Sequence, residues 1–121
     1  HLVKPFGAME DALVRAAICG HLVGVARARS WPLDELDALG AAAVALAAFD
    51  VATDLRSPAV WRVLEATLVY AAAAIRTADQ RLSDAAAADA NDVVAHRWVR
   101  DRALMRVARG RRAARLARAR R

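Results

Sequence analysis

The chain has 121 residues, of which 58% are hydrophobic and 33 are alanine, and its formal net charge is +6. This length predicts a single domain with one core, and the alanine content together with only eight glycines and prolines favours long helices over short strands. The single cysteine excludes an intrachain disulfide and gives no sign of an oxidising compartment, so we expect a cytoplasmic protein.

The first predicted helix runs from about Phe6 to Arg27. Apolar residues recur along this stretch at helical spacing and form one wide face, which consists of Met9, Leu13, Val14, Ala17, Ile18, Leu22 and Val25. We expect this face to pack into the core. His21 falls in the same apolar helix, and we expect it to be a partly buried core residue.

A short break, SWPLDELD at residues 30–37, separates this helix from the second. Ser30 or Trp31 is the predicted N-cap, and Pro32 suits the first turn because it lacks a backbone N–H. The acidic residues that follow favour the positive end of the helix dipole. We expect the second helix to continue to about Leu55.

The third helix has the clearest start signal. In the stretch RSP, Ser57 is the predicted N-cap and Pro58 the first helical residue. From there a stripe of apolar residues recurs at steps of three and four residues, formed by Trp61, Leu64, Leu68, Ala71, Ile75, Ala78 and Leu82. We expect this stripe to face the core.

The fourth helix follows the polar stretch SDAAAADAND at residues 83–92. This stretch offers four alternative caps, which are Ser83, Asp84, Asp89 and Asn91. The helix body carries a narrow apolar stripe, formed by Val94, Trp98, Met105 and Ala108. Beyond Arg109 the stripe stops, because Gly110 weakens the helix and Arg112 takes the next position on the line. We expect the last residues to leave the core.

Together these patterns predict an all-α fold. The first three helices are each expected to have about 20 to 25 residues, and short connections between helices of matched length indicate antiparallel neighbours. We therefore predict an up-down antiparallel four-helix bundle over residues 1–109, followed by a basic C-terminal extension, the Arg-rich tail, at residues 110–121. The longest apolar runs, at residues 39–49 and 66–75, are too short to cross a bilayer, so we expect no membrane span.

The positive charge is concentrated at the C-terminus. Residues 97–121 contain eleven arginines and one acid, whereas the remaining 96 residues carry a net charge of −4. A basic end on an acidic body can bind nucleic acid, an anionic membrane or an acidic partner surface. No aromatic residue accompanies the arginines past Trp98, so nucleic acid would bind through its phosphates, without sequence preference. The candidate anion-binding residues are Arg109, Arg111, Arg112, Arg115 and Arg118; the alternative is a solvated arm without a ligand.

No complete active site is visible in the sequence. Cys19 and His21 are two positions apart and point to opposite sides of a helix, so they do not form a thiolate pair. Asp92 and His96 form one helical pair without further metal ligands. There is also no glycine-rich phosphate loop and no combination of serine, histidine and aspartate.

The remaining acidic candidates have structural roles in this interpretation. Asp50 and Asp54 share a helix face but lack the histidines of a di-iron site, so we expect them to support a helix or an interface. Glu65 and Asp79 each follow an arginine by three positions. We expect these arginines, Arg62 and Arg76, to neutralise them.

Three stretches in order cover most of the chain: HLVKPFGAMEDALVRAAICGHLVGVARARSWP, DLRSPAVWRVLEATLVYAAAAIRTADQRL and HRWVRDRALMRVARGRRAARLARARR. Together they resemble the C-terminal helical domain of a divergent branch of acyl-CoA dehydrogenases, most clearly at residues 100–119. The resemblance implies a helical bundle that packs against flavin and acyl-CoA and forms a dimer or tetramer interface. The chain lacks the Arg/Gln-Phe-Gly stretch that contacts the neighbouring flavin, and no glutamate occupies a recognisable α-proton base position. No catalytic residue is therefore assigned from the family.

Two functions follow from these observations. The resemblance implies a helical assembly and cofactor-proximal domain without independent catalysis, which binds no cofactor alone and meets FAD only within a larger flavoprotein. Its partners would be a second copy, giving a homodimer, or missing flavoprotein domains, and its tail arginines would meet CoA phosphates or an acidic partner. The alternative is a small basic module that binds nucleic acid or another polyanion through its C-terminus.

Overall fold

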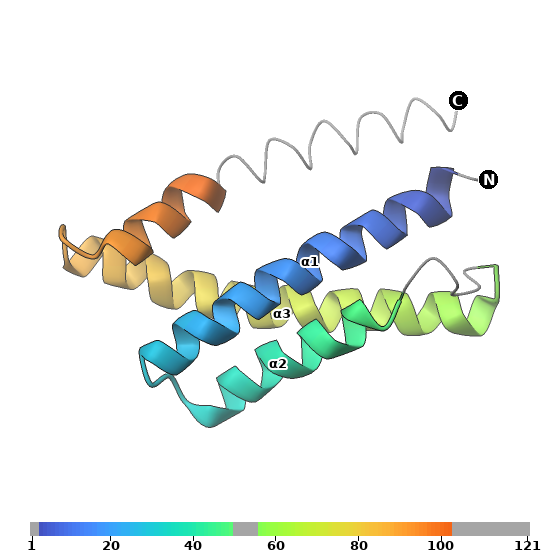
Figure 1. Ribbon diagram of the computed structural model, residues 1–121, viewed down its shortest axis with the longest axis horizontal. Coiled ribbons are helices and arrows are strands. Elements are labelled where there is room, and N and C mark those ends of the chain that lie inside the picture. Colours follow the sequence, from blue (N-terminus) through green and yellow to red (C-terminus); the bar gives the residue numbers. More distant parts are fainter. Residues whose placement is uncertain (1–2, 50–55, 103–121) are drawn as a thin grey trace. The chain divides into compact units, whose positions relative to one another are not determined.

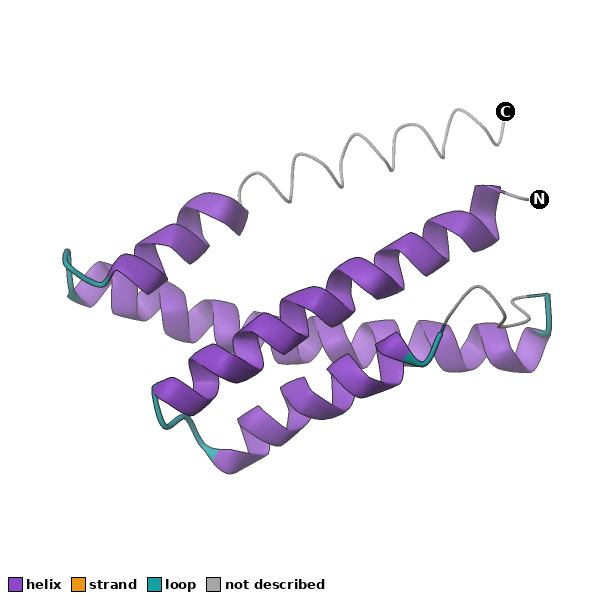
Figure 2. Cartoon of the chain, in the orientation of Figure 1, coloured by secondary structure: helices purple, strands orange, loops and turns teal. Residues whose placement is uncertain are grey.

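The computed structural model describes residues 3–49 and 56–102, and the regular structure in these ranges is helical throughout (Figure 1, Figure 2). The helices are α1 (Val3–Ala28), α2 (Leu33–Ala47) and α3 (Pro58–Ala88), and a further helical segment covers residues 93–102. The described residues thus contain four helical segments and no strand. The predicted all-α class is confirmed for this part of the chain.

The chain forms two compact units, residues 1–78 and 79–121, whose boundary falls inside α3. In the first unit, α1 and α2 are joined by a short turn and pack against each other as a helical hairpin (Figure 1). The core of this unit combines leucines with small residues, namely Ala12, Cys19, Leu22, Ala26, Leu39, Ala42, Leu46, Phe49, Leu64, Ala71 and Ala78. Small residues at these positions let neighbouring helix backbones approach closely.

The buried face of α1 differs from the predicted one. Leu22 is fully buried as expected, but Leu13 and Val14 are 54% and 49% exposed. His21 is also exposed, so its prediction as a partly buried core residue is wrong. Besides Leu22, the buried positions of α1 are the small residues Ala12, Cys19 and Ala26, whose size allows a neighbouring helix to pack closely.

The helices are not matched in length, contrary to prediction, since α1, α2 and α3 contain 26, 15 and 31 residues. α2 ends at Ala47 and does not continue to Leu55. The N–H of Phe49 donates to the carbonyl of Leu46 at 3.2 Å, a three-residue step that tightens the last turn while the Phe49 side chain becomes buried. α3 is longer than expected because its alanine-rich end continues the helix to Ala88.

The start and the core stripe of α3 agree with the predictions. The helix begins at Pro58, and the N–H of Val60 donates to the Ser57 hydroxyl at 3.5 Å. The stripe residues Leu64, Ala71, Ala78 and Leu82 are buried, and Trp61, Leu68 and Ile75 are partly buried. Capping and periodicity are sufficient to predict the start and the buried face of this helix, because both signals lie within one helix.

The fourth helical segment starts at residue 93, and its N-cap is not among the predicted alternatives. Asp92 is the N-cap, because its carboxylate accepts a hydrogen bond from the N–H of Ala95 at 3.1 Å. Asp89 instead accepts the N–H of Asn91 at 2.8 Å and stabilises the preceding turn. All four predicted alternatives for this cap are therefore wrong.

The buried face of residues 93–102 is also shifted from the predicted stripe. Trp98 is buried as expected, at 8% exposure, but Val94 is 44% exposed and its neighbour Ala95 is fully buried. The rest of the stripe, Met105 and Ala108, lies outside the described residues, as do the predicted domain boundary at residue 109 and the Arg-rich tail.

The turn between α1 and α2 contains a left-handed residue. Ser30 has φ 54°, and it lies between two hydrogen bonds that close the end of α1. Its own N–H donates to the Arg27 carbonyl at 3.3 Å, and the N–H of Trp31 donates to the Ala26 carbonyl at 3.0 Å. These two bonds form a Schellman motif. Ser30 thus ends α1, and the N-cap of α2 is Pro32, without a side-chain cap bond, so the predicted capping role of Ser30 or Trp31 is wrong.

Replacing Ser30 with glycine is expected to stabilise the chain by about 1 kcal/mol, because a left-handed backbone costs glycine less than any residue with a Cβ. Urea denaturation followed by circular dichroism measures the change as a higher midpoint. The matched control is Ser30→Ala, which keeps the Cβ and should bring no gain. Equal midpoints for the glycine and alanine variants would contradict the left-handed geometry.

Candidate functional site

The candidate anion-binding residues Arg109, Arg111, Arg112, Arg115 and Arg118 lie outside the described residues. Their role therefore stays a prediction. The described part of the chain contains three other features: a polar network in the second unit, a small pocket in the first unit, and exposed apolar surface.

The polar network joins the end of α3 to residues 93–102. The Asp79 carboxylate accepts a hydrogen bond from the indole N–H of Trp98 at 2.8 Å. It also forms an ion pair with the Arg102 guanidinium at 2.6 Å. The same Arg102 nitrogen donates to the Ser83 hydroxyl at 2.7 Å. The side chains of Asp79 and Arg102 are each only 25% exposed. The prediction that Arg76 neutralises Asp79 missed these partners.

This arrangement is suited to fastening two helical segments, and it is a poor anion site. Arg102 already faces a carboxylate, so an incoming phosphate would have to compete with Asp79. The sequence did contain a signal for the network. Asp79 and Ser83 lie one helical turn apart on α3, as do Trp98 and Arg102 on the next segment, so two acceptors can meet two donors.

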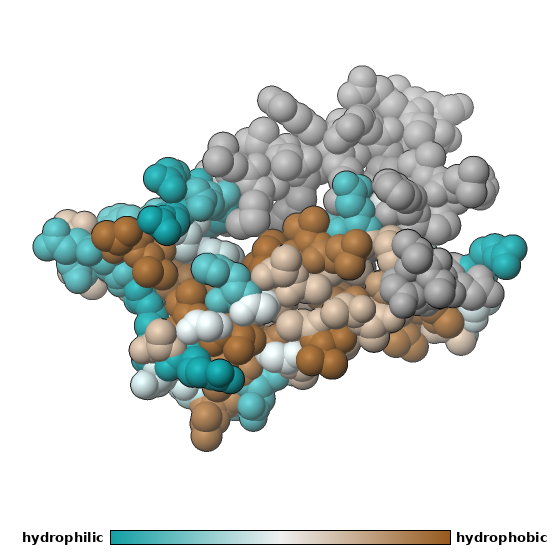
Figure 3. All heavy atoms as spheres, viewed as in Figure 1, coloured by the Kyte–Doolittle hydropathy of each residue, from teal (hydrophilic) through white to brown (hydrophobic). Residues whose placement is uncertain are grey.

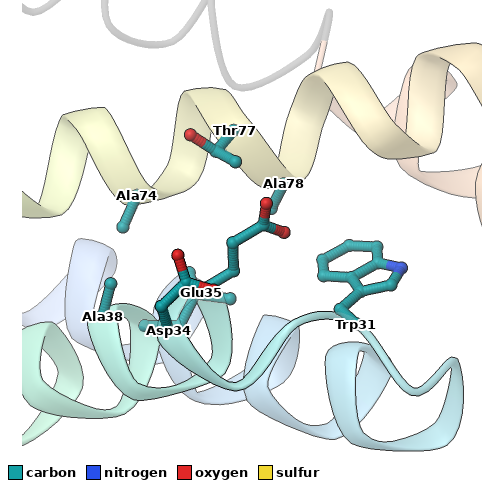
Figure 4. A pocket seen from close by; sticks show the side chains of 8 residues that line it. Trp31, Asp34, Glu35, Ala38, Ala74, Thr77 and Ala78 are labelled. Carbon is teal, nitrogen blue, oxygen red and sulfur yellow. The ribbon is translucent and has the colours of Figure 1, made fainter.

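The pocket lies between the start of α2 and the middle of α3 and has a volume of about 150 Å³ (Figure 4). It is lined by Trp31, Asp34, Glu35, Ala38, Leu39, Ala74, Thr77 and Ala78. In Figure 4 the Glu35 side chain extends from α2 toward α3, with the Trp31 ring beside it. Asp34 and Glu35 occupy the first turn of α2, where acidic residues are favoured by the helix dipole.

The chemistry available in this pocket is limited. Its polar side chains are two carboxylates and the Thr77 hydroxyl, with no histidine, cysteine or basic group among the lining residues. No group of three or more potential metal ligands occurs within residues 3–49 and 56–102. The pocket therefore shows neither a nucleophile paired with a base nor a metal site.

The other catalytic candidates have structural partners. The Nε2 atom of His96 lies 3.0 Å from the carbonyl of Asp89, while the Asp92 carboxylate serves as the cap described above. The indole N–H of Trp61 donates to Glu65 at 2.5 Å, a partner other than the predicted Arg62. Asp50 and Asp54 lie outside the described residues.

Cys19 is fully buried in the α1 face that packs on α2, and burial raises the pKa of its thiol, with a smaller opposing effect from the Arg15 guanidinium. The thiolate is the nucleophilic form, so a raised pKa leaves less of it at any given pH. Cys19 is thus an inert core residue.

Alkylation of Cys19 by iodoacetamide is expected to be slow in the native chain, and its rate should rise only at a higher pH than for a free thiol, above about 8.5. In urea the same cysteine should react with the pH dependence of a free thiol. Mass spectrometry over a pH series measures both rates. A native rate equal to the urea rate at pH 8 would show that the thiol is accessible.

Apolar side chains are exposed on several helices, and Figure 3 shows them along α1 and α2. The most exposed are Leu33 and Val44, both at 74%, and Val69 of α3, at 69%. Among the described residues, α3 is the helix long and apolar enough to cross a membrane, judged by length and composition only, and 11% of its most apolar stretch is buried. The expectation of no membrane span stays a prediction.

The comparisons with known proteins add no relative. No family model, no curated protein and no solved structure matches the chain.

Proposed function

We propose that this chain is a helical assembly domain without a catalytic site of its own. One observation carries the proposal: nine large apolar side chains in the described residues are exposed, from 44% for Val94 to 74% for Val44. Three of them, Val63, Val69 and Tyr70, share one face of α3, and contiguous exposed apolar surface of this kind is typical of a protein contact. The polar network at Asp79 holds two helical segments together, and Asp92 caps the last one.

The setting we propose for this role is an acyl-CoA dehydrogenase-like flavoprotein, on the strength of the sequence resemblance. The proposal includes the up-down four-helix bundle and the cytoplasmic location expected from the sequence. The pocket at Glu35 does not fit FAD or CoA, because about 150 Å³ is below the usual range of ligand sites and its carboxylates would repel phosphates. Any flavin would therefore be held mainly by other domains.

Sedimentation velocity over a concentration series tests the assembly role. A mass that rises above the 13.0 kDa of one chain supports it, and a constant mass of 13.0 kDa rules out self-assembly. The flavoprotein setting has a separate test, which is the coding sequence next to this chain. A flavoprotein domain in the same reading frame is the expected result, and an unrelated neighbouring domain would contradict the setting.

A second function is favoured by the charge distribution. Residues 103–121 contain eight arginines and no acid, which suits non-specific binding of a polyanion. Binding to unrelated DNA duplexes should weaken steeply as salt is raised from about 50 to 200 mM. Glutamine at Arg109, Arg111, Arg112, Arg115 and Arg118 should reduce both the affinity and the salt slope. Affinity that is indifferent to salt would exclude a phosphate-driven mechanism.

A further inference from the structure

The side of α3 that carries no buried residue has its own regular pattern. Six residues on this side form what we call the outer α3 stripe: Ala59, Val63, Ala66, Val69, Tyr70 and Ala73. All six residues are exposed, with Val63 at 58%, Val69 at 69% and Tyr70 at 49%. At 100° per residue, the whole stripe lies within about 60° on either side of Ala66. It is therefore one continuous face, separate from the stripe that packs into the core.

The outer α3 stripe is symmetric about Ala66. Counting outward from this residue, valine occurs three positions away in each direction and alanine occurs seven positions away in each direction. An antiparallel copy of the same helix, centred on the same residue, would therefore place Ala59 against Ala73 and Val63 against Val69. A two-fold symmetric interface requires this kind of self-complementary surface.

The symmetry also supplies a partner for the charged residue within this face. Arg62 lies four positions before Ala66, and Tyr70 lies four positions after it. In the antiparallel pair each Arg62 guanidinium would meet the Tyr70 ring of the other copy, a favourable cation–π contact. The alanines at every seventh position would let the two backbones come close, near the 8 to 10 Å usual for packed helices.

From these observations we infer that the outer α3 stripe is a homodimer interface, in which two copies of α3 pair antiparallel about Ala66. The inference rests on the assembly role proposed above and names its partner, a second copy of this chain. From Ala59 to Ala73 the contact is about 21 Å long, at 1.5 Å per residue. This places it at the small end of specific interfaces, so the dimer is a weak one that dissociates on dilution.

A charge placed on the symmetry axis tests the interface. In Ala66→Glu the two new carboxylates face each other across the dimer, which should weaken dimerisation at least tenfold, since juxtaposed like charges are strongly unfavourable. The matched control is Ala87→Glu, which adds the same charge at an exposed position of α3 beyond the stripe. Sedimentation equilibrium measures the dimerisation of both variants. It is done in about 0.3 M salt, because the charges of the arginine-rich end are screened there. Circular dichroism should show unchanged helix content in both variants.

A cross-link tests the register. Ala66→Cys places two thiols at the symmetry axis. With helix axes 8 to 10 Å apart and each Cα about 2.3 Å from its own axis, the two facing Cα atoms lie roughly 3.5 to 5.5 Å apart, which allows a disulfide to form on oxidation. The control Ala87→Cys should give little cross-linked dimer. The native Cys19 does not interfere, because it is fully buried.

The possible results separate this inference from the assembly role. Dimerisation that persists unchanged in Ala66→Glu, with no cross-link through position 66, would overturn the α3 pairing and leave assembly through another face. A wild-type chain that stays monomeric would overturn both the pairing and self-assembly. Wild-type chain that is monomeric in buffer but cosediments with phosphatidylcholine vesicles, while Ala66→Glu does not, would assign the stripe to a bilayer and also overturn the pairing.

Discussion

Leu22→Ala is expected to lower the free energy of unfolding by about 3 kcal/mol, because the side chain is fully buried where α1 packs and its removal leaves a cavity that the helices fill only in part. Thermal denaturation measures the loss as a lower midpoint. The matched control is Leu13→Ala on the same helix, where the side chain is 54% exposed and the cost should stay within about 0.5 kcal/mol. Equal losses at the two positions would show that the buried face of α1 is misassigned.

Asp79→Ala should destabilise the chain by about 2 kcal/mol, because it leaves the Trp98 indole and the Arg102 guanidinium without their shared acceptor in a site that is only 25% exposed. Urea denaturation followed by circular dichroism measures the effect as a lower midpoint. The control is Asp84→Ala, an exposed residue whose hydrogen bond comes from Gln80 at 2.9 Å and should contribute little.

The conservative variant Asp79→Asn separates the two bonds of this carboxylate. An asparagine oxygen still accepts from the Trp98 indole but carries no charge for Arg102, so its cost should fall between those of the wild type and the alanine variant. A loss equal to that of Asp79→Ala would mean that the ion pair dominates. No loss in either variant would refute a stabilising role for the network.

The sequence predicted well what depends on neighbours within one helix. The start of α3 at Pro58 and its stripe from Leu64 to Leu82 were correct, because a cap and a periodic pattern are local signals. The four-helix composition and the absence of strands in the described residues follow from the same kind of signal. The predicted anion-binding arginines lie beyond the described residues and stay untested.

Two of the errors involve contacts between helices. The Asp79 network joins residues 19 and 23 positions apart, so it depends on how two segments align, which periodicity within one segment does not encode. The predicted face of α1 is wrong because it rests on large apolar residues, whereas Ala12, Cys19 and Ala26 are buried and their small size admits the neighbouring helix. The predicted equal helix lengths failed because no glycine or proline marks the end of α2 at Ala47.

The three indoles of this chain lie in three different places: Trp31 in the turn before α2, Trp61 near the start of α3, and Trp98 in the last described segment. Each is the only tryptophan of its segment, so variants that retain one of them report the melting of that segment alone. Coincident melting curves would mean that the chain unfolds as one cooperative body, and staggered curves would mean that its parts open in sequence. The sequence thus carries its own built-in optical probes of folding cooperativity.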